Sequence, residues 1–210
     1  MLSPRRNITL NLAVLLAISG CAGQGGVGGF GEGVGKDGRS VKKLAPSVAT
    51  PMEVVERMLS LAGVQRDDVV YDLGSGDGRI VITAAKKYGA RAVGFEIDPR
   101  LVKESRNNVR RAGVQDLVEI RQLDILQADL SGATVVTLYL FPEANRLLRP
   151  RLWSQLKVGA RVVSNYFDMD EWVPDRFEEV LDVQTGFYHN IHLWRITGRP
   201  KLMPTDREDR

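Results

Sequence analysis

The segment "VVYDLGSGDGRIV", residues 69–81, constrains the fold of this chain more than any other stretch. It runs from apolar β-branched residues through Asp72 into alternate glycines, Gly74, Gly76 and Gly78, and then into a helix-like pattern. In open parallel sheets, the first strand-to-helix turn is where glycines let a ligand approach the main chain. The segment therefore predicts a strand, a ligand-binding turn and a helix of an α/β fold.

Strands and helices alternate along the rest of residues 47–198, which we predict to be the folded domain. Continuous apolar strands are typical of a parallel sheet covered on both faces. The candidates are "DVVYD", "RAVGFE", "VEIRQLD", "TVVTLYLF" and "ARVVSNYF". Two more, "FEEVLDVQ" and "NIHLWRIT", have a connection too short for a crossover helix. We therefore expect a Rossmann-like, mostly parallel seven-strand sheet with helices on both faces and an antiparallel C-terminal hairpin.

The stretch "TPME", residues 50–53, predicts the start of the first helix of this domain. Thr50 is the expected N-cap, Pro51 suits the first helical position, and Glu53 completes a capping box. We therefore expect the helix to begin at Pro51.

Residues 1–21 have the layout of a secretory signal, with two arginines, an apolar run of about a dozen residues and then small residues. The run is shorter than the ~20 residues that span a bilayer. Its ending, "ISGC", resembles a bacterial lipoprotein signal, which implies lipid on Cys21 and an exported, membrane-anchored protein. The alternative is a cytoplasmic protein with an uncleaved N-terminus. Glycine-rich residues 22–46 predict a flexible linker, and residues 199–210 a disordered tail.

Charge and cysteine content exclude several classes of partner. The formal net charge is only +3, and the basic residues are scattered, so no nucleic-acid partner is indicated. A single cysteine excludes an internal disulfide and any cysteine-rich zinc site. His189 and His192 have no third ligand in view, so we predict no metal site. The oligomeric state is left open.

The charges around the glycine turn favour a cationic ligand. A dinucleotide fingerprint would place its third glycine at position 79, where this chain has Arg79. The lysine of a nucleoside-triphosphate loop is also missing. Asp72 and Asp77 flank the glycines and would repel a pyrophosphate. S-adenosylmethionine carries an ammonium and a sulfonium and no phosphate, so it fits this turn better. The plainer alternative is that both aspartates only cap a helix.

Acidic residues end the next two strands as well. Glu96 lies about 20 residues after the turn, where an acid at a nucleotide-type site takes both ribose hydroxyls. At the end of the third strand, Asp124 is placed to accept from an adenine amine and Ile125 to cover the ring. The candidate cofactor-binding residues are Asp72, Gly74, Ser75, Gly76, Asp77, Glu96, Ile97, Asp124 and Ile125.

The motifs "YDLGSGDGRI", "GFEID" and "RQLDIL" resemble, in order and spacing, those of class I S-adenosylmethionine-dependent methyltransferases. Roughly residues 48–196 more narrowly resemble a bacterial group similar to the ATP-synthase c-subunit lysine methyltransferases. The resemblance implies Asp72 near the methionine ammonium, Gly74 and Gly76 along the methionine tail, Glu96 at the ribose and Asp124 at the adenine. It also implies a protein lysine as acceptor. That group usually has a histidine where this chain has Asn165, which puts the role of this position in doubt.

Methyl transfer from a sulfonium needs alignment and a desolvated nucleophile more than it needs an acid or base. For a lysine acceptor, Glu143 and Asp168 are candidates to relay the proton. Acceptor contacts are expected after the fourth and fifth strands, although the aromatic residues among them suit a core equally well. These residues are Tyr139, Phe141, Pro142, Asn145, Asn165, Tyr166 and Trp172.

Two other functions remain compatible with the sequence. The first is a methyltransferase of a small molecule or a lipid-linked substrate, which a membrane tether would suit. The second is a non-catalytic nucleoside-binding module, because an exported protein would lie apart from a cofactor that is made in the cytoplasm.

Overall fold

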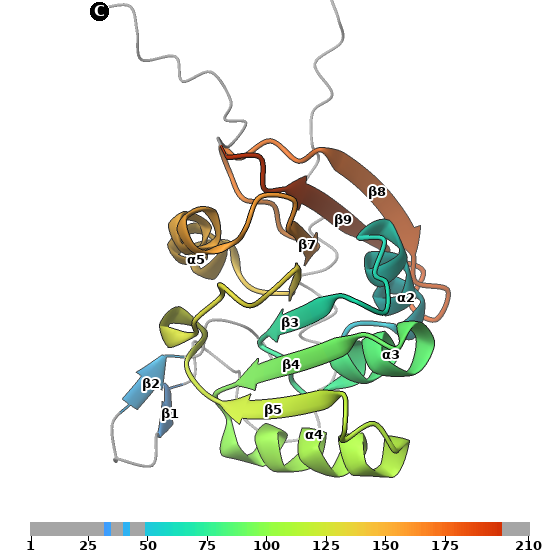
Figure 1. The fold of residues 1–210 in the computed structure, drawn as a ribbon. Helices are drawn as coiled ribbons and strands as arrows, with labels where there is room; N and C mark the ends of the chain where they lie inside the picture. Colours follow the sequence, from blue (N-terminus) through green and yellow to red (C-terminus); the bar gives the residue numbers. More distant parts are fainter. Residues whose placement is uncertain (1–31, 35–39, 43–48, 199–210) are drawn as a thin grey trace, which may run out of the picture. The chain divides into compact units, whose positions relative to one another are not determined.

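A computed structural model describes residues 32–34, 40–42 and 49–198 (Figure 1). Its main element is a seven-stranded sheet in the order β5-β4-β3-β6-β7-β9-β8. Strands β3 to β7 are parallel, whereas β9 is antiparallel to both of its neighbours. This arrangement confirms the predicted mostly parallel sheet and its C-terminal hairpin. The strands are β3 Val69–Leu73, β4 Arg91–Glu96, β5 Val118–Gln122, β6 Val135–Leu138, β7 Arg161–Asn165, β8 Arg176–Leu181 and β9 Tyr188–Arg195.

Apolar side chains cover both faces of the sheet because neighbouring residues of a strand point to opposite faces. Val70 packs into one core with α2, α3 and α4, whereas Tyr71 packs into a second core with α5. In Figure 1 the orange-to-red hairpin of β8 and β9 lies beside α2, which contacts both strands. The helices are α2 Met52–Leu61, α3 Arg79–Tyr88, α4 Pro99–Ala112 and α5 Pro142–Gln155, with a short 3-10 helix, η1, at Ile125–Gln127.

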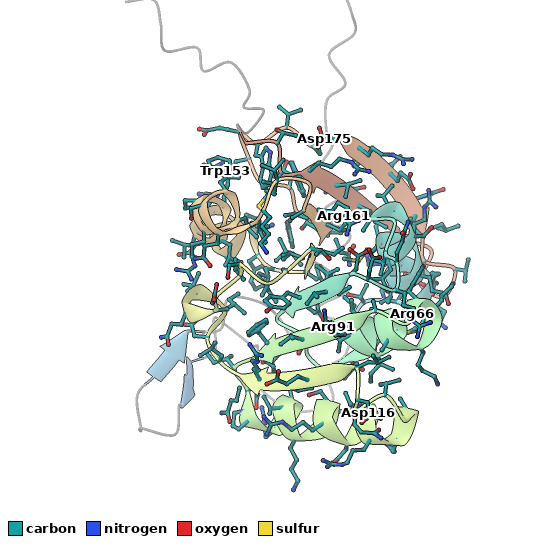
Figure 2. The ribbon with its side chains drawn as sticks, in the orientation of Figure 1. Arg66, Arg91, Asp116, Trp153, Arg161 and Asp175 are labelled. Carbon is teal, nitrogen blue, oxygen red and sulfur yellow. The ribbon has the colours of Figure 1, made fainter. Side chains whose placement is uncertain are left out.

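The amino edge of the sheet is closed by an internal ion pair. Asp68, just before β3, forms an ion pair with Arg161 of β7 and accepts a hydrogen bond of 2.6 Å from the Thr134 hydroxyl (Figure 2). Burial raises the pKa of Asp68, but these hydrogen bonds and the arginine charge outweigh it and lower the pKa below its usual value. Asp68 and Arg161 therefore neutralise each other's charge.

Helix α2 begins differently from the prediction, and the capping box is wrong. The helix starts at Met52, Pro51 occupies the cap position, and no side chain caps the first turn. The Thr50 carbonyl instead accepts a hydrogen bond of 2.7 Å from the Arg79 side chain. A contact between distant segments therefore outweighs the local capping preference of Thr50.

Two short strands, β1 Glu32–Val34 and β2 Ser40–Lys42, form an antiparallel pair inside the predicted linker 22–46. The linker is therefore not without secondary structure over its whole length. The predicted signal with Cys21 and the predicted tail 199–210 lie outside the described residues. Across the part that is described, no helix has the length and apolar character needed to cross a bilayer.

Candidate functional site

The glycine turn presents bare main chain at the carboxyl edge of the sheet. Gly74, Gly76 and Gly78 have φ angles of +84°, +53° and +84°, in the left-handed region that suits glycine. A Cβ atom on Gly74 would meet Leu140 at 3.0 Å, whereas at Gly76 it would meet no described atom within 4 Å. Gly76 therefore borders open space into which a ligand can come close to the main chain.

Glu96 holds this turn from the neighbouring strand. Its carboxylate accepts hydrogen bonds from the main-chain N–H groups of Gly76 at 2.9 Å, Ile97 at 2.8 Å and Asp98 at 2.9 Å. The side chain is only 8% exposed. One buried acid thus fixes the end of β4 and the glycine turn together.

Asp72 is a buried acid that has no counter-charge among the described residues. It is 3% exposed and accepts a hydrogen bond of 2.7 Å from Thr137. Burial, helped by the charges of Glu96 and Asp77 and opposed by the Thr137 hydrogen bond, raises the pKa of Asp72 to about 7. In the described part of the chain, no lysine or arginine forms an ion pair with it. A ligand that brings a positive charge would stabilise its ionised form.

Asp77 differs from Asp72 because its charge is balanced within the chain. Arg79 donates to both of its carboxylate oxygens, from Nε at 3.0 and 3.1 Å and from Nη2 at 2.7 Å. Burial raises the pKa of Asp77, but these bonds and the arginine charge bring it below its usual value. Asn108 also donates to the Asp77 carbonyl at 2.8 Å. The electrostatic case for a cationic ligand therefore rests on Asp72 and not on Asp77.

The other predicted cofactor-binding residues gather at the same edge. Asp124 accepts from the Leu126 N–H at 2.9 Å and begins η1, while Ile125 is buried and Ile97 half-buried. The hydroxyl of Ser75 is buried and has no hydrogen-bond partner among the described residues. With the open space at Gly76 and the uncompensated Asp72, these features fit a nucleoside that carries a positive charge. Which part of such a nucleoside each of these residues contacts stays a prediction.

Aromatic residues form the adjoining part of the edge, after β6 and β7. Tyr166 has a φ of +71°, rare for a bulky residue, and its N–H donates to the Asn190 carbonyl at 2.6 Å. Burial raises the pKa of Tyr139, and the charge of the Tyr166 phenol adds to the shift. Phe141 packs on Phe167 with ring centroids 6.2 Å apart. The predicted acceptor-side residues Tyr139, Phe141 and Tyr166 thus come from two neighbouring strand ends.

Two predicted acceptor residues instead have structural roles. Trp172 is 2% exposed and packs between Trp153 of α5 and Trp194, with ring centroids 5.4 and 5.5 Å away (Figure 2). It belongs to the core, so its placement on the acceptor side is corrected. Asn145 is fully buried, and its amide donates to the Asp168 carbonyl at 3.0 Å. It therefore holds the loop after β7, while its Oδ1 is buried without a hydrogen-bond partner among the described residues.

The proposed proton relays lie in solvent. Glu143 and Asp168 are both exposed, as is Pro142, the first residue of α5. Asp168 accepts a hydrogen bond of 3.0 Å from the Asp170 N–H within its own turn. Neither carboxylate is desolvated, and desolvation is what tunes a catalytic acid or base in most active sites.

A residue that the sequence did not place at this edge is His189. Its Nδ1 lies 3.1 Å from Oδ1 of the fully buried Asn165. The pairing of β7 and β9 is what indicates this position. In their antiparallel register Asn165 lies opposite Ile191, so His189 lies two residues further toward the carboxyl edge. The other histidine, His192, stacks on Trp194 with ring centroids 5.7 Å apart. In the described segments, no three His, Cys, Asp or Glu residues come together as metal ligands.

Known proteins resemble the chain across this whole domain. The profile of the ANTKMT methyltransferase domain matches residues 72–176. A protein-lysine N-methyltransferase of Saccharolobus islandicus is 44% identical over 72% of this chain and 93% of its own length. The ATP synthase c-subunit lysine N-methyltransferase of Xenopus laevis is 37% identical over 65% of this chain and 59% of its own length.

A solved structure adds the cofactor. A crystal structure of a protein described as an RNA methyltransferase from Salinibacter ruber, in complex with S-adenosyl-L-homocysteine, is 54% identical in sequence. The match has a TM-score of 0.67 and covers 77% of this chain and 100% of that one. Its bound ligand is the product that S-adenosylmethionine leaves after it has given up its methyl group.

Proposed function

This chain belongs to the ANTKMT methyltransferase domain family and is an S-adenosylmethionine-dependent methyltransferase, and from that premise we propose that it methylates lysine side chains of a protein. The names of the Saccharolobus and Xenopus relatives both specify lysine, which supports a protein acceptor. Family membership also removes the alternative of a non-catalytic nucleoside-binding module.

The observation that carries the lysine proposal is the charge of the carboxyl edge. Three arginines follow the strand ends there, and each is paired with a carboxylate: Arg79 with Asp77, Arg100 with Asp98, and Arg146 with Asp170. The same loops carry further acids at Asp72, Glu96, Asp124, Glu143 and Asp168. A polyanion such as RNA would meet net negative charge, whereas a lysine ammonium would be attracted.

We assign the cofactor contacts to the residues that the sequence predicted. Asp72 binds the ammonium of the methionine part, and the main chain at Gly74 and Gly76 lies along that part. Glu96 accepts from the ribose hydroxyls. The adenine lies against Ile97, Asp124 and Ile125, and Asp77 supports the turn through Arg79. When bound, S-adenosylmethionine supplies a methyl group on a positively charged sulfur.

The acceptor residues then have to align and desolvate an amine. Tyr139 and Tyr166 supply ring faces that attract a cation and phenol oxygens that accept hydrogen bonds. The ring of Phe167 packs against Tyr166 with centroids 5.1 Å apart and limits its movement. Such a wall excludes water from the amine, which is what an in-line displacement requires of the protein.

Transfer of tritiated methyl groups tests the acceptor class. The purified protein is incubated with labelled S-adenosylmethionine and, separately, with bacterial membrane proteins, soluble proteins, total RNA and a lipid extract. We expect label in protein, recovered as methyllysine after acid hydrolysis. Label in RNA or in the lipid and small-molecule fractions, with none in protein, would contradict the proposal. The Gly76→Val variant serves as the control without cofactor binding.

Export with a lipid anchor on Cys21 is a separate proposal, supported by the pattern of residues 1–21 alone. Mass spectrometry of the membrane fraction should find a diacylglyceryl group on Cys21, absent from the Cys21→Ser variant. An unmodified chain that starts at Met1 in the soluble fraction would show instead that the protein is cytoplasmic.

A further inference from the structure

The half-buried His189 and the buried Asn165 form a polar pair beside the aromatic residues of the acceptor side. The distance from His189 Nδ1 to Asn165 Oδ1 is 3.1 Å. With the Asn165 amide in this orientation its oxygen accepts, so Nδ1 carries the proton, while the amide nitrogen Nδ2 is buried without a hydrogen-bond partner among the described residues. The second ring nitrogen, Nε2, therefore keeps its lone pair and is the basic atom of the imidazole.

The imidazole continues the aromatic wall at this edge. The Tyr166 ring lies edge-on to it, with centroids 6.3 Å apart, and Tyr139 follows the neighbouring strand β6. The hydrogen bond from Tyr166 N–H to Asn190 ties the unusual backbone of Tyr166 to the residue after His189. Two phenols and one imidazole thus come from three neighbouring strands.

The charges around His189 come from two elements. Glu53 of α2 and Asp182 of the β8–β9 turn both favour its charged form. Burial outweighs them and lowers the pKa of His189 below 6.5, so the ring is neutral at pH 7. A neutral imidazole is able to accept a proton, and Asn165 fixes the tautomer that does so.

We propose that His189 takes the proton that the acceptor lysine must lose before methylation, and that Asn165 is the residue that positions it. This rests on the proposed lysine acceptor. The proton passes from the lysine Nζ to His189 Nε2. The freed lone pair of Nζ then forms the bond to the methyl carbon, while the carbon–sulfur bond breaks and its electron pair stays on sulfur. The imidazolium afterwards releases its proton to water. The exposed Glu143 and Asp168 are not needed.

The test compares His189→Gln with the wild type in the formation of methyllysine from tritiated S-adenosylmethionine and a bacterial protein extract. At pH 7 and saturating cofactor, we expect kcat to fall by about 100-fold, the lower end for a lost general base. The defect should shrink as pH rises toward the lysine pKa of about 10.4, because solvent then deprotonates the amine. The Kd for S-adenosylmethionine should not change.

The matched control is His192→Gln, on the same strand but stacked on Trp194, which should keep its activity at every pH. A His189→Gln enzyme with wild-type activity, or with a defect that is equal at all pH values, overturns the proposal. If that variant does not fold, His189→Asn is compared with the wild type in the same assay, and the same two outcomes overturn the proposal. A wild type that forms no methyllysine at any pH overturns the lysine acceptor itself, and this inference with it.

Discussion

The two halves of the carboxyl edge are held in place by different kinds of contact. On the cofactor side, Glu96 binds the main chain of its own loop and of Gly76, so one short stretch organises the turn. On the acceptor side, Asn145 holds the loop after β7 from another helix, and His189 reaches Asn165 from the last strand. The cofactor side is thus fixed by one buried carboxylate that binds several main-chain N–H groups, and the acceptor side by separate contacts of single side chains.

This difference indicates which half tolerates change. A main-chain cradle needs glycines and buried acids in fixed order, because bare backbone has no substitute. The acceptor side depends on which side chains the fold brings together, so a residue such as Asn165 can work with a partner from another strand. The amino edge is a third arrangement, in which Asp68 and Arg161 neutralise each other.

The largest expected effect is the loss of cofactor binding by a substitution in the glycine turn. The Gly76→Val variant places a side chain at a φ of +53° and in the space that the ligand needs. We expect the affinity for S-adenosylmethionine to fall by about 100-fold or more, close to 3 kcal/mol, in isothermal titration. Gly113→Val is the matched control, since Gly113 has a φ of +70°, no described atom within 4 Å, and a place at the end of α4. Equal loss of binding in both variants would argue against the assigned cofactor site.

An intermediate effect concerns pH. Because the pKa of Asp72 is raised to about 7, the acid is largely protonated below that pH in the free enzyme. A bound cation favours the ionised form, so binding releases a proton and affinity increases with pH. Titrations between pH 5.5 and 7.5 should show about a tenfold weaker affinity for each unit below 7. The Asp72→Asn variant should bind weakly with no such slope, and a wild type without a slope would contradict this role of Asp72.

The smallest expected effects come from two substitutions, one on the acceptor side and one on the cofactor side of the carboxyl edge. Asn145→Leu removes the hydrogen bond to the Asp168 carbonyl, and Asn108→Leu removes the matching bond to the Asp77 carbonyl. We expect Asn145→Leu to lower kcat by about tenfold through misalignment of the acceptor, with an unchanged Kd for the cofactor. Asn108→Leu should weaken the cofactor several-fold and leave the KM for the protein acceptor unchanged. If each variant disturbs both measurements equally, the two halves are not independent.

Much of the cofactor side could be predicted because its signals are local. The glycines of residues 74–78 need a left-handed backbone, and the strands end in acids at regular intervals, so order and spacing suffice to place Asp72, Glu96 and Asp124 on one edge. Contacts between segments that are far apart in sequence could not be predicted in this way. The ion pair of Arg79 with Asp77 spans only two residues, but nothing near Thr50 in sequence shows that the same arginine binds its carbonyl. Trp172 carried no signal that would assign it to the core between two other tryptophans.

The sequence by itself determined the sheet, the hairpin and the cationic character of the ligand, because apolar periodicity, glycine conformation and the sign of nearby charges act over a few residues. Only the tertiary structure decided that Asp72 is buried with no counter-charge among the described residues and that His189, not His192, contacts Asn165. Both properties depend on packing between segments more than twenty residues apart. Sheet pairing creates these surroundings, and the residues next to Asp72 and His189 in sequence do not encode them.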